Sequence, residues 1–372
     1  MPTLDKNRVV VAMSGGVDSS VAALLLKEQG YEVIGISMKT HEEPEGRGEV
    51  TSPVQKSKKS CCAVEDIEDA RRVASLLDIP FYPFNFKEEF REAVIKYFVH
   101  EYGIGRTPNP CVLCNQKLKF SALLTEAKRL GAYHLATGHY VQKVTDNLGR
   151  HLLRRAADKE KDQSYFLFNL NQDQLGHLLF PIGSLTKEEV RQRARDSGLM
   201  TAEKPESQEI CFIPDNKTAV FVKSQLPVYQ QKPGSFVSKE GEKIADHDGI
   251  HNYTIGQRRG LNVAVGERMY VTEIRPASGE VVLGHSEDLL KTTVFASGIT
   301  LLTREGVQGT MEVEAKIRYR HSPAKARLTL SDGGLNARIE FEEPQRAVTP
   351  GQAIVFYDGE KMLGGGWIEK SA

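Results

Sequence analysis

Three cysteines stand in polar stretches that suit a reactive thiol better than a packed core does. Cys111 and Cys114 form a Cys-x-x-Cys pair, and Cys211 stands alone further along the chain. Prolines at positions 108 and 110 fix a non-helical approach to the pair, so we expect both thiols at or just before a helix start. The thiolate form is favoured there. One thiolate can accept a sulfur atom as a persulfide, and a second thiol can attack it to release that sulfur.

The other two cysteines, Cys61 and Cys62, are adjacent and cannot easily bridge each other, so we interpret them mainly as structural. Five cysteines, an odd number clustered in one part of a large chain, do not fit a secreted disulfide framework. The chain also shows no long apolar run and no basic and apolar leader before its first strand. We therefore expect a cytoplasmic protein without a membrane partner.

A second candidate site is the loop Ser14-Gly15-Gly16-Val17-Asp18-Ser19-Ser20, between an apolar run and a helical pattern that stops at Gly30. Its glycines let backbone N–H groups approach an anion, its serines add hydroxyl donors, and the helix start adds a positive dipole end. The loop is therefore predicted to hold phosphates. A carboxylate beside phosphates needs a cation between them, so Asp18 is expected to bind the Mg²⁺ of a nucleoside triphosphate. The glycine spacing is that of neither a Walker loop nor a dinucleotide fold.

The elements around this loop predict an α/β domain with a parallel sheet. A strand is expected at residues 31–38 after the first helix, a third at 79–84 and a fourth at 134–137, which ends in Gly138-His139. Ligands of such sheets bind at the carboxyl ends of the strands, where the phosphate loop also lies. His139 is there too, either as a structural histidine or as a contact to a ligand or RNA. A capping box, Thr186 with Glu189, predicts a helix over 186–197.

From about Lys217 the pattern changes to short alternating segments with glycine turns. Strands are expected at residues 270–274, 281–283, 311–319, 326–330, 337–341 and 353–357. Strands at hairpin spacing predict a small antiparallel β-barrel at the end of the chain. We expect a catalytic domain over residues 1–216, a central domain over 217–283 and the barrel over 284–372.

The formal net charge is +0, so any surface for nucleic acid has to be local. Residues 316–327 hold lysines and arginines without an acid, with Tyr319 and His321 between them. This basic patch is either a solvated strand face or a site for phosphate contact and base stacking. A second, weaker basic cluster is Gln257-Arg258-Arg259-Gly260.

The Ser-Gly-Gly-x-Asp-Ser-Ser loop resembles that of the PP-loop ATP pyrophosphatases, an adenine nucleotide alpha hydrolase-like fold. With residues 109–115, 208–212 and 256–261 also in order, the chain resembles the tRNA-specific 2-thiouridylases over nearly its whole length. The resemblance implies that ATP adenylates the C2 oxygen of the wobble uridine in the lysine, glutamate and glutamine tRNAs. Sulfur from a cysteine persulfide then replaces the oxygen, and AMP and pyrophosphate leave.

The resemblance also implies roles for single residues. Cys211 would carry the persulfide, and Cys114 would free its sulfur or close a transient disulfide with it. The ATP site would comprise Ala12, Met13, Ser14, Gly15, Gly16, Val17, Asp18, Ser19, Met38 and Gly138. The target base would face Asn109, Pro110 and Cys111, and other tRNA contacts would be His139, Lys161, Asp162, Gln163, Arg318, Tyr319 and Gln352.

Many members of this family carry an aspartate where this chain has Cys111, which leaves three readings of the cysteines. In the first, Cys111 is an extra thiol, and a sulfur-donor protein, a cysteine desulfurase or a relay, loads Cys211. In the second, Cys111, Cys114 and Cys211 hold an iron-sulfur cluster with one open iron. Zinc is a third option, although its sites usually want four ligands or a histidine.

Two other functions stay open at the level of the sequence. The loop alone also fits an ATP-dependent ligase or amidating enzyme that acts on a small acid, although no cysteine follows Met1 to supply ammonia from glutamine. The barrel with Arg318 and Tyr319 also fits a non-catalytic RNA-binding module.

Overall fold

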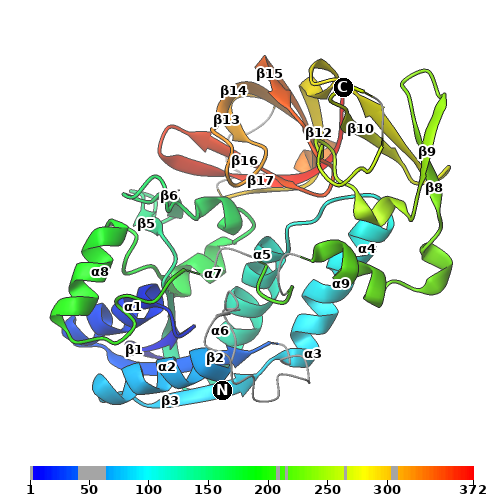
Figure 1. Ribbon diagram of the computed structural model, residues 1–372. Helices are drawn as coiled ribbons and strands as arrows, with labels where there is room; N and C mark the ends of the chain where they lie inside the picture. Colours follow the sequence, from blue (N-terminus) through cyan, green and yellow to red (C-terminus); the bar gives the residue numbers. More distant parts are fainter. Residues whose placement is uncertain (1–2, 41–63, 207–209, 214–216, 264–265, 303–308) are drawn as a thin grey trace, which may run out of the picture. The chain divides into compact units, whose positions relative to one another are not determined.

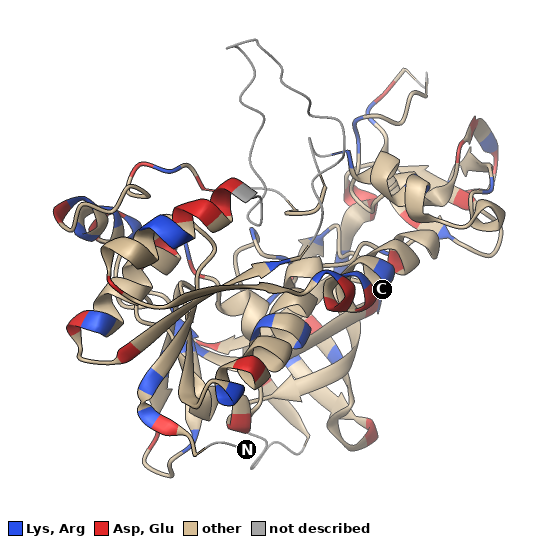
Figure 2. Ribbon diagram, turned by 90° about the horizontal axis from the view of Figure 1, so that it is seen from below, with Lys and Arg blue, Asp and Glu red and all other residues tan. Residues whose placement is uncertain are grey.

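The computed structural model describes residues 3–40, 64–206, 210–213, 217–263, 266–302 and 309–372 (Figure 1). Cys61, Cys62 and Gln208 lie outside these residues. The chain divides into two compact units, Met1–Val94 with Cys111–Asn216 and Ile95–Pro110 with Lys217–Ala372. Among the described residues, no helix is long and apolar enough to cross a membrane. Basic and acidic residues both occur on many of the helices and strands (Figure 2).

The first unit is built on the predicted parallel sheet. In the described residues its strand order is β3-β2-β1-β4-β7 and every pairing is parallel. The strands are β1 Asp5–Ala12, β2 Glu32–Lys39, β3 Phe81–Asn85, β4 Ala132–Thr137 and β7 Leu178–Leu179. Val9, Val10 and Val11 are fully buried, as a strand with both faces covered requires. The α/β prediction is confirmed.

The described α-helices belong to both units. They are α1 Val17–Glu28, α2 Val64–Leu76, α3 Lys87–Phe90, α4 Lys96–Gly103, α5 Pro110–Leu113, α6 Leu123–Arg129, α7 Gln172–His177, α8 Lys187–Asp196 and α9 Thr218–Gln225. The capping box at the start of α8 is confirmed, because Thr186 and Glu189 satisfy each other's backbone N–H groups. Two π-helical segments, Arg91–Ile95 and Cys114–Ala122, interrupt the helices. Such bulges are frequent at functional sites, and the second begins at a predicted catalytic cysteine.

The second unit holds a small sheet and a closed barrel. The sheet has the order β10-β11-β8-β9 in the described residues, from β8 Gly234–Val237, β9 Lys243–His247, β10 Tyr270–Arg275 and β11 Glu280–Gly284. The barrel strands are β12 Leu290–Leu301, β13 Thr310–Lys316, β14 Ala324–Ser331, β15 Asn336–Arg346, β16 Ala353–Asp358 and β17 Lys361–Ser371. Because β12 pairs antiparallel with both β15 and β17, the barrel closes. The predicted antiparallel barrel is confirmed.

Local expectations failed at several strands. The strand predicted over residues 311–319 ends at Lys316, so Arg318 and Tyr319 lie in a turn that the His321 N–H closes on the Arg318 carbonyl. The hairpin β5 Val141–Thr145 with β6 His151–Arg155 was not predicted, nor were β12 and β17. Strand β17 contains Gly364-Gly365-Gly366, which reads as a turn. The glycine at 364 is required instead because a Cβ there would collide with the Thr300 carbonyl.

Candidate active site

The glycine-rich loop has the geometry of an anion cradle at the carboxyl end of β1. Gly15 has φ +70°, and a Cβ there would collide with the backbone of Asp66, so only glycine fits. Gly16 precedes α1 without a capping side chain, which leaves the first N–H groups of the helix to a ligand. The Ser19 hydroxyl accepts from the Ser14 N–H at 3.1 Å and donates to the Gly16 carbonyl at 3.1 Å. The loop is therefore pre-shaped for phosphate.

The predicted nucleotide residues converge around this cradle. A Cβ at Gly138, after β4, would lie 2.7 Å from the Asp18 carbonyl carbon and from the Ser19 nitrogen. Met38 stands near the end of β2, whose Ser37 hydroxyl donates to the Met13 carbonyl at 2.8 Å. Strands β2 and β4 thus flank the loop in the way that the parallel sheet predicts.

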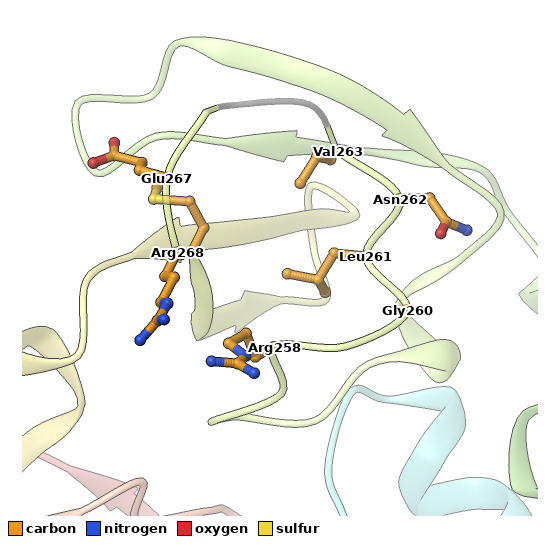
Figure 3. A pocket seen from close by; sticks show the side chains of 8 residues that line it. Arg258, Gly260, Leu261, Asn262, Val263, Glu267 and Arg268 are labelled. Atoms are coloured by element: carbon orange, nitrogen blue, oxygen red, sulfur yellow. The ribbon is translucent and has the colours of Figure 1, made fainter.

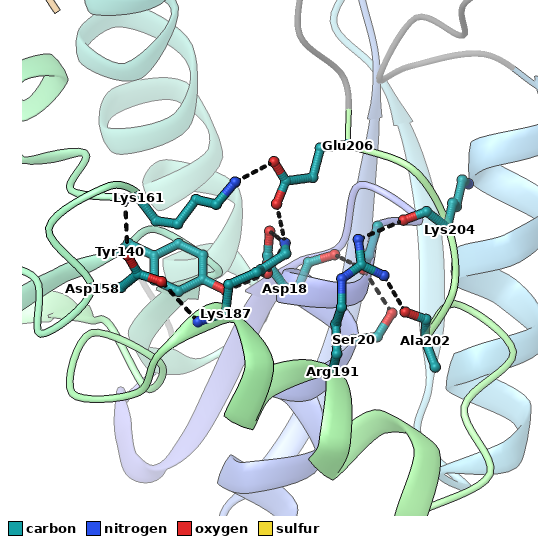
Figure 4. Close-up of polar contacts among 12 residues, drawn as sticks. Asp18, Ser20, Tyr140, Asp158, Lys161, Lys187, Arg191, Ala202, Lys204 and Glu206 are labelled. Carbon is teal, nitrogen blue, oxygen red and sulfur yellow. Dashed lines mark hydrogen bonds and ion pairs between the residues drawn. The ribbon is translucent and has the colours of Figure 1, made fainter. Parts of the chain in front are cut away.

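Asp18 is held by cationic and hydroxyl donors (Figure 4). The Lys187 ammonium binds both carboxylate oxygens, at 2.8 and 2.9 Å, and the Tyr140 hydroxyl donates to Oδ1 at 2.7 Å. Burial and the nearby charge of Asp18 raise the pKa of Tyr140, so its proton stays on the phenol. Lys187 is therefore the counter-ion of the Asp18 carboxylate.

Glu206 extends this network toward the chain that leads to Cys211. Its two carboxylate oxygens accept one ion pair each, from Lys187 at 2.8 Å and from Lys161 at 2.8 Å. Burial raises the pKa of Glu206, but the hydrogen bonds from the two lysines outweigh it, so the pKa lies below its ordinary value. Two residues earlier, Lys204 donates to the Gly15 carbonyl at 2.9 Å and to Asp66 at 2.6 Å. The residues before Cys211 are thus attached to the phosphate loop.

Sequence reasoning missed Tyr140, Lys187, Lys204 and Glu206. One signal was available for Lys187, which occupies the first position of a capped helix. The helix dipole disfavours a cation there, and a carboxylate partner from elsewhere in the fold explains it.

Several predicted tRNA contacts serve local structure here. Asp162 is buried and accepts from the backbone N–H groups of Ala156 and Ser164, both at 3.2 Å. Gln163 accepts from the Tyr140 N–H at 3.0 Å. Their roles toward tRNA stay predictions.

His139 is buried beside Phe120 and Phe180, with ring centroids 5.7 and 6.4 Å away. Its Nδ1 shares a hydrogen bond of 2.6 Å with the Thr137 hydroxyl. Burial, and secondarily the charge of Lys119, hold the pKa of His139 well below its usual range, so the ring is neutral. A neutral ring fits a hydrogen bond to a base better than an ion pair with a phosphate.

The structure describes all three candidate cysteines. Cys111 lies in α5 and is exposed, while Cys114 and Cys211 are partly exposed. Beside Cys211, the buried ring of Phe212 packs edge-on against Phe90 at 5.5 Å. Within the residues described, no three or more His, Cys, Asp or Glu side chains are grouped to hold a metal ion.

Two predicted tRNA residues of the second unit bond to backbone carbonyls. The Gln352 side-chain amide donates to the carbonyls of Thr107 and Pro108, at 2.8 and 3.2 Å. The Arg318 guanidinium donates to the carbonyl of Arg346 and, at 3.1 Å, to that of Ala347.

A pocket of about 250 Å³ lies in the second unit, at the weaker basic cluster (Figure 3). Arg258 and Arg268 contribute guanidinium groups to it from two chain segments, and Leu261, Val263 and Met269 contribute apolar surface. Its described lining contains no nucleophile. Guanidinium groups beside apolar surface suit a phosphate with its attached nucleoside, so the pocket fits a binding role.

Family models match three successive parts of the chain. They are described as tRNA methyl transferase HUP domain, over residues 7–215, tRNA methyl transferase PRC-barrel domain, over 220–285, and Aminomethyltransferase beta-barrel domain, over 291–368.

Curated relatives match over nearly the full length. The chain is 47% identical over 372 residues to the tRNA-specific 2-thiouridylase MnmA of Clostridium perfringens, covering 98% of this chain and 99% of the relative. It is 49% identical over 365 residues to that of Geotalea uraniireducens, covering 98% and 95%. It is 47% identical over 371 residues to that of Carboxydothermus hydrogenoformans, covering 100% of both chains.

Two solved structures have lower identity to this chain. NH3-dependent NAD synthetase from Campylobacter jejuni is 18% identical with a TM-score of 0.33, covering 53% of this chain and 66% of that one. NMN synthetase from Francisella tularensis is 13% identical with a TM-score of 0.31, covering 54% and 65%.

Proposed function

The chain belongs to the tRNA-specific 2-thiouridylase family, and from this premise we propose how its own residues carry out the reaction. It is a tRNA-thiolating enzyme with an ATP-using HUP domain. We assign catalysis to residues 1–216, a linking role to 217–283 and tRNA binding to 284–372. The substrate is the wobble uridine of the lysine, glutamate and glutamine tRNAs, and the site of action is the cytoplasm.

The observation that carries the proposal is the geometry around Asp18. A glycine cradle, a helix start and a lysine surround one carboxylate in the unit that also contains Cys114 and Cys211. In the first step the C2 oxygen of uridine attacks the α-phosphate of ATP, which forms an adenylated uridine and releases pyrophosphate. The loop N–H groups and Lys187 stabilise the charge that develops on this leaving group.

Asp18 also fits a role as a Mg²⁺ ligand. A carboxylate at the edge of a phosphate cradle offers the oxygen atoms that Mg²⁺ prefers, and the ion would neutralise the charge of the ATP phosphates. Lys187 now balances the charge of Asp18. The ammonium and the metal ion would therefore share the acidic groups Asp18 and Glu206.

In the second step, sulfur replaces the activated oxygen. A sulfur-donor protein, a cysteine desulfurase or a relay, transfers one sulfur atom to Cys211 and leaves a persulfide. The terminal sulfur bonds to C2 of the uridine, and AMP leaves with the original oxygen. Cys114 attacks the Cys211 sulfur, so a Cys114–Cys211 disulfide forms as the thiocarbonyl is released. A cellular thiol reduces this disulfide before the next cycle.

Cys111, Asn109 and Pro110 face the base.

An iron-sulfur cluster on Cys111, Cys114 and Cys211 is the alternative for the same residues. Such a cluster would bind hydrosulfide at an open iron. The described residues hold no grouping of this kind. Iron and acid-labile sulfide in anaerobically purified protein, both lost in Cys111→Ala, would select this alternative.

tRNA recognition is proposed for basic and polar residues of both units. Arg318 and Tyr319, in a turn, would contact the phosphate backbone and a base, and Arg258 and Arg268 would bind a phosphate in their pocket. His139, Lys161, Asp162 and Gln163 remain the other proposed contacts, whereas the Gln352 amide donates to the carbonyls of Thr107 and Pro108.

The test is retardation of purified tRNA on a gel that contains mercury, after incubation with ATP, a cysteine desulfurase and cysteine. Thiolated tRNA is expected from the native chain and not from Cys211→Ser or Asp18→Ala. Pyrophosphate release that requires a small acid and ignores tRNA would favour a ligase instead. Salt-sensitive tRNA binding without AMP formation would favour an RNA-binding module.

A further inference from the structure

Thr107 and Pro108 are bonded from two sides within the second unit. The Thr107 N–H donates to the Pro350 carbonyl at 2.9 Å, and its hydroxyl shares a hydrogen bond of 3.0 Å with the Thr254 hydroxyl. The Gln352 side chain donates to the carbonyls of both residues. Every polar group of Thr107 is therefore engaged, by the barrel or by the residues before β10.

Arg106, one residue earlier, is fixed by acids. It donates to Glu101 at 2.7 Å, and also to Glu369 of strand β17. Burial raises the pKa of Glu369, but the hydrogen bonds from Arg106 and Ser297 lower it by more. The pKa therefore lies below its ordinary value, and this carboxylate stays ionised at neutral pH. Residues 106–108 thus have a single defined path.

The barrel turn at Gly351 meets this path at backbone distance. Gly351 has φ +89°, and a Cβ there would lie 3.0 Å from the Thr107 carbonyl oxygen and 3.1 Å from its nitrogen. A side chain at this position has no room unless Thr107 moves. The close contact of Gly351 therefore fixes the position of the Thr107 backbone.

A shift of Thr107 passes along the chain because two prolines follow it. Pro108 and Pro110 have fixed φ angles, so the segment has fewer backbone torsions with which to absorb a displacement. Asn109 and Cys111, which our proposed function places against the target base, come directly after.

We propose that Gly351 and Gln352 form a positioning element for the base-facing segment Asn109–Cys111. Gln352 then acts on the reaction through the carbonyls of Thr107 and Pro108. Both N–H bonds of its amide are committed to these carbonyls, so a tRNA contact by the same nitrogen would have to release them. This inference rests on the proposed function for the identity of the segment.

The first test compares Gly351→Ala with Gly359→Ala. Both glycines have positive φ in turns of the barrel, but a Cβ at Gly359 meets nothing within 4 Å. Gly351→Ala is expected to slow single-turnover thiolation at saturating tRNA and ATP by roughly ten- to a hundredfold, with the tRNA Kd within about twofold. Gly359→Ala, at φ +56°, is expected to keep the native rate, and so is Gly334→Ala, whose φ of +84° is close to that of Gly351 while a Cβ there meets nothing within 4 Å. Equal rates in Gly351→Ala and these controls would overturn the proposal.

The second test uses Gln352→Met, which keeps the length of the side chain and removes its donor. A positioning role predicts a lower rate at saturating tRNA with little change in the tRNA Kd. A separate variant, Gln352→Glu, also lacks the amide donor and should be as slow as Gln352→Met. A weaker Kd with a native rate at saturation would assign Gln352 to tRNA contact and overturn the proposal. Failure of the native chain and of Gly359→Ala to thiolate tRNA would instead refute the proposed function.

Discussion

The two functional segments of this chain are held in opposite ways. Around the phosphate loop, charged side chains hold one another, with Lys187 between Asp18 and Glu206. Around Thr107, neutral hydrogen bonds from Thr254, Gln352 and the Pro350 backbone hold main-chain atoms. In the proposed function, ATP and Mg²⁺ would compete for the charges of the first set, and neither would compete for the second. We therefore expect the first region to exchange partners when the nucleotide binds and the second to stay in place.

The largest effect is expected where the charged set loses its central cation. Lys187→Met leaves the carboxylates of Asp18 and Glu206, which are 30% and 25% exposed, without their shared cation, and the loss is expected to cost up to about 3 kcal/mol. Loss of a charge-stabilising group lowers the rate by about a hundredfold or more. Pyrophosphate release with tRNA, and urea unfolding, measure the two effects.

The matched control for this change is Lys243→Met. Lys243 pairs with Asp246 at 2.7 Å, but the side chains are 59% and 73% exposed. Such a surface pair contributes about 0–1 kcal/mol, so native activity and nearly native stability are expected. Equal losses of activity and stability in both variants would show that the ion pairs of Lys187 with Asp18 and Glu206 do not differ from a surface ion pair.

The next effect separates the regions by their ligands. Gly138→Ala places a Cβ 2.7 Å from the Asp18 carbonyl carbon, and overpacking of this kind typically costs about 1–3 kcal/mol. ATP affinity is expected to fall while tRNA affinity stays native, the reverse of a change in the RNA interface. Calorimetric ATP titration and tRNA filter binding check it, and a native ATP affinity would contradict the assigned cradle.

A smaller effect is expected at the basic pocket. Arg258→Gln and Arg268→Gln should each weaken tRNA binding and reduce the slope of log K against log salt by about one. Arg338→Gln is the control, because Arg338 is paired with Glu340 at 2.9 Å. An unchanged slope in both pocket variants would remove the pocket from the tRNA interface.

The smallest effect concerns acid. The pKa of Glu206 lies below its ordinary value of 4.5 because the bonds from Lys161 and Lys187 outweigh burial. A carboxylate whose pKa is lowered in the folded protein stabilises the fold at every pH above its pKa in the unfolded chain. This stability is lost as the pH falls through the pKa of the folded protein. Glu206→Gln should therefore flatten the fall of unfolding free energy below about pH 4.5. An identical slope in the native chain would contradict the pairing.

The sequence predicts what depends on local pattern. The buried strand at Val9–Val11, the glycine loop and the capping box at Thr186 each form within a few residues, and the structure confirms them. The family and the fold class are confirmed as well. The roles of the three cysteines and of the tRNA residues stay predictions.

What the sequence does not show depends on distant partners. Lys187 meets Asp18 across 169 positions, and Gln352 meets Thr107 across 245. No local spacing encodes such pairs. Strand β17 was missed because its glycines resemble a turn, although they allow close approach to β12. Arg318 and Tyr319 were placed on a strand because alternation continues past Lys316, where the chain in fact turns.

The central claim is that Cys211 carries the sulfur that enters the tRNA. Peptide mass spectrometry after incubation with a cysteine desulfurase and cysteine tests it most directly, with Cys111→Ser alongside. If Cys211 carries the persulfide, the Cys211 peptide of both proteins is expected to gain one sulfur atom. Once ATP and tRNA are added, a Cys114–Cys211 disulfide should replace it. A protein that thiolates tRNA while its Cys211 peptide never gains sulfur would contradict the proposed role of Cys211 as sulfur carrier.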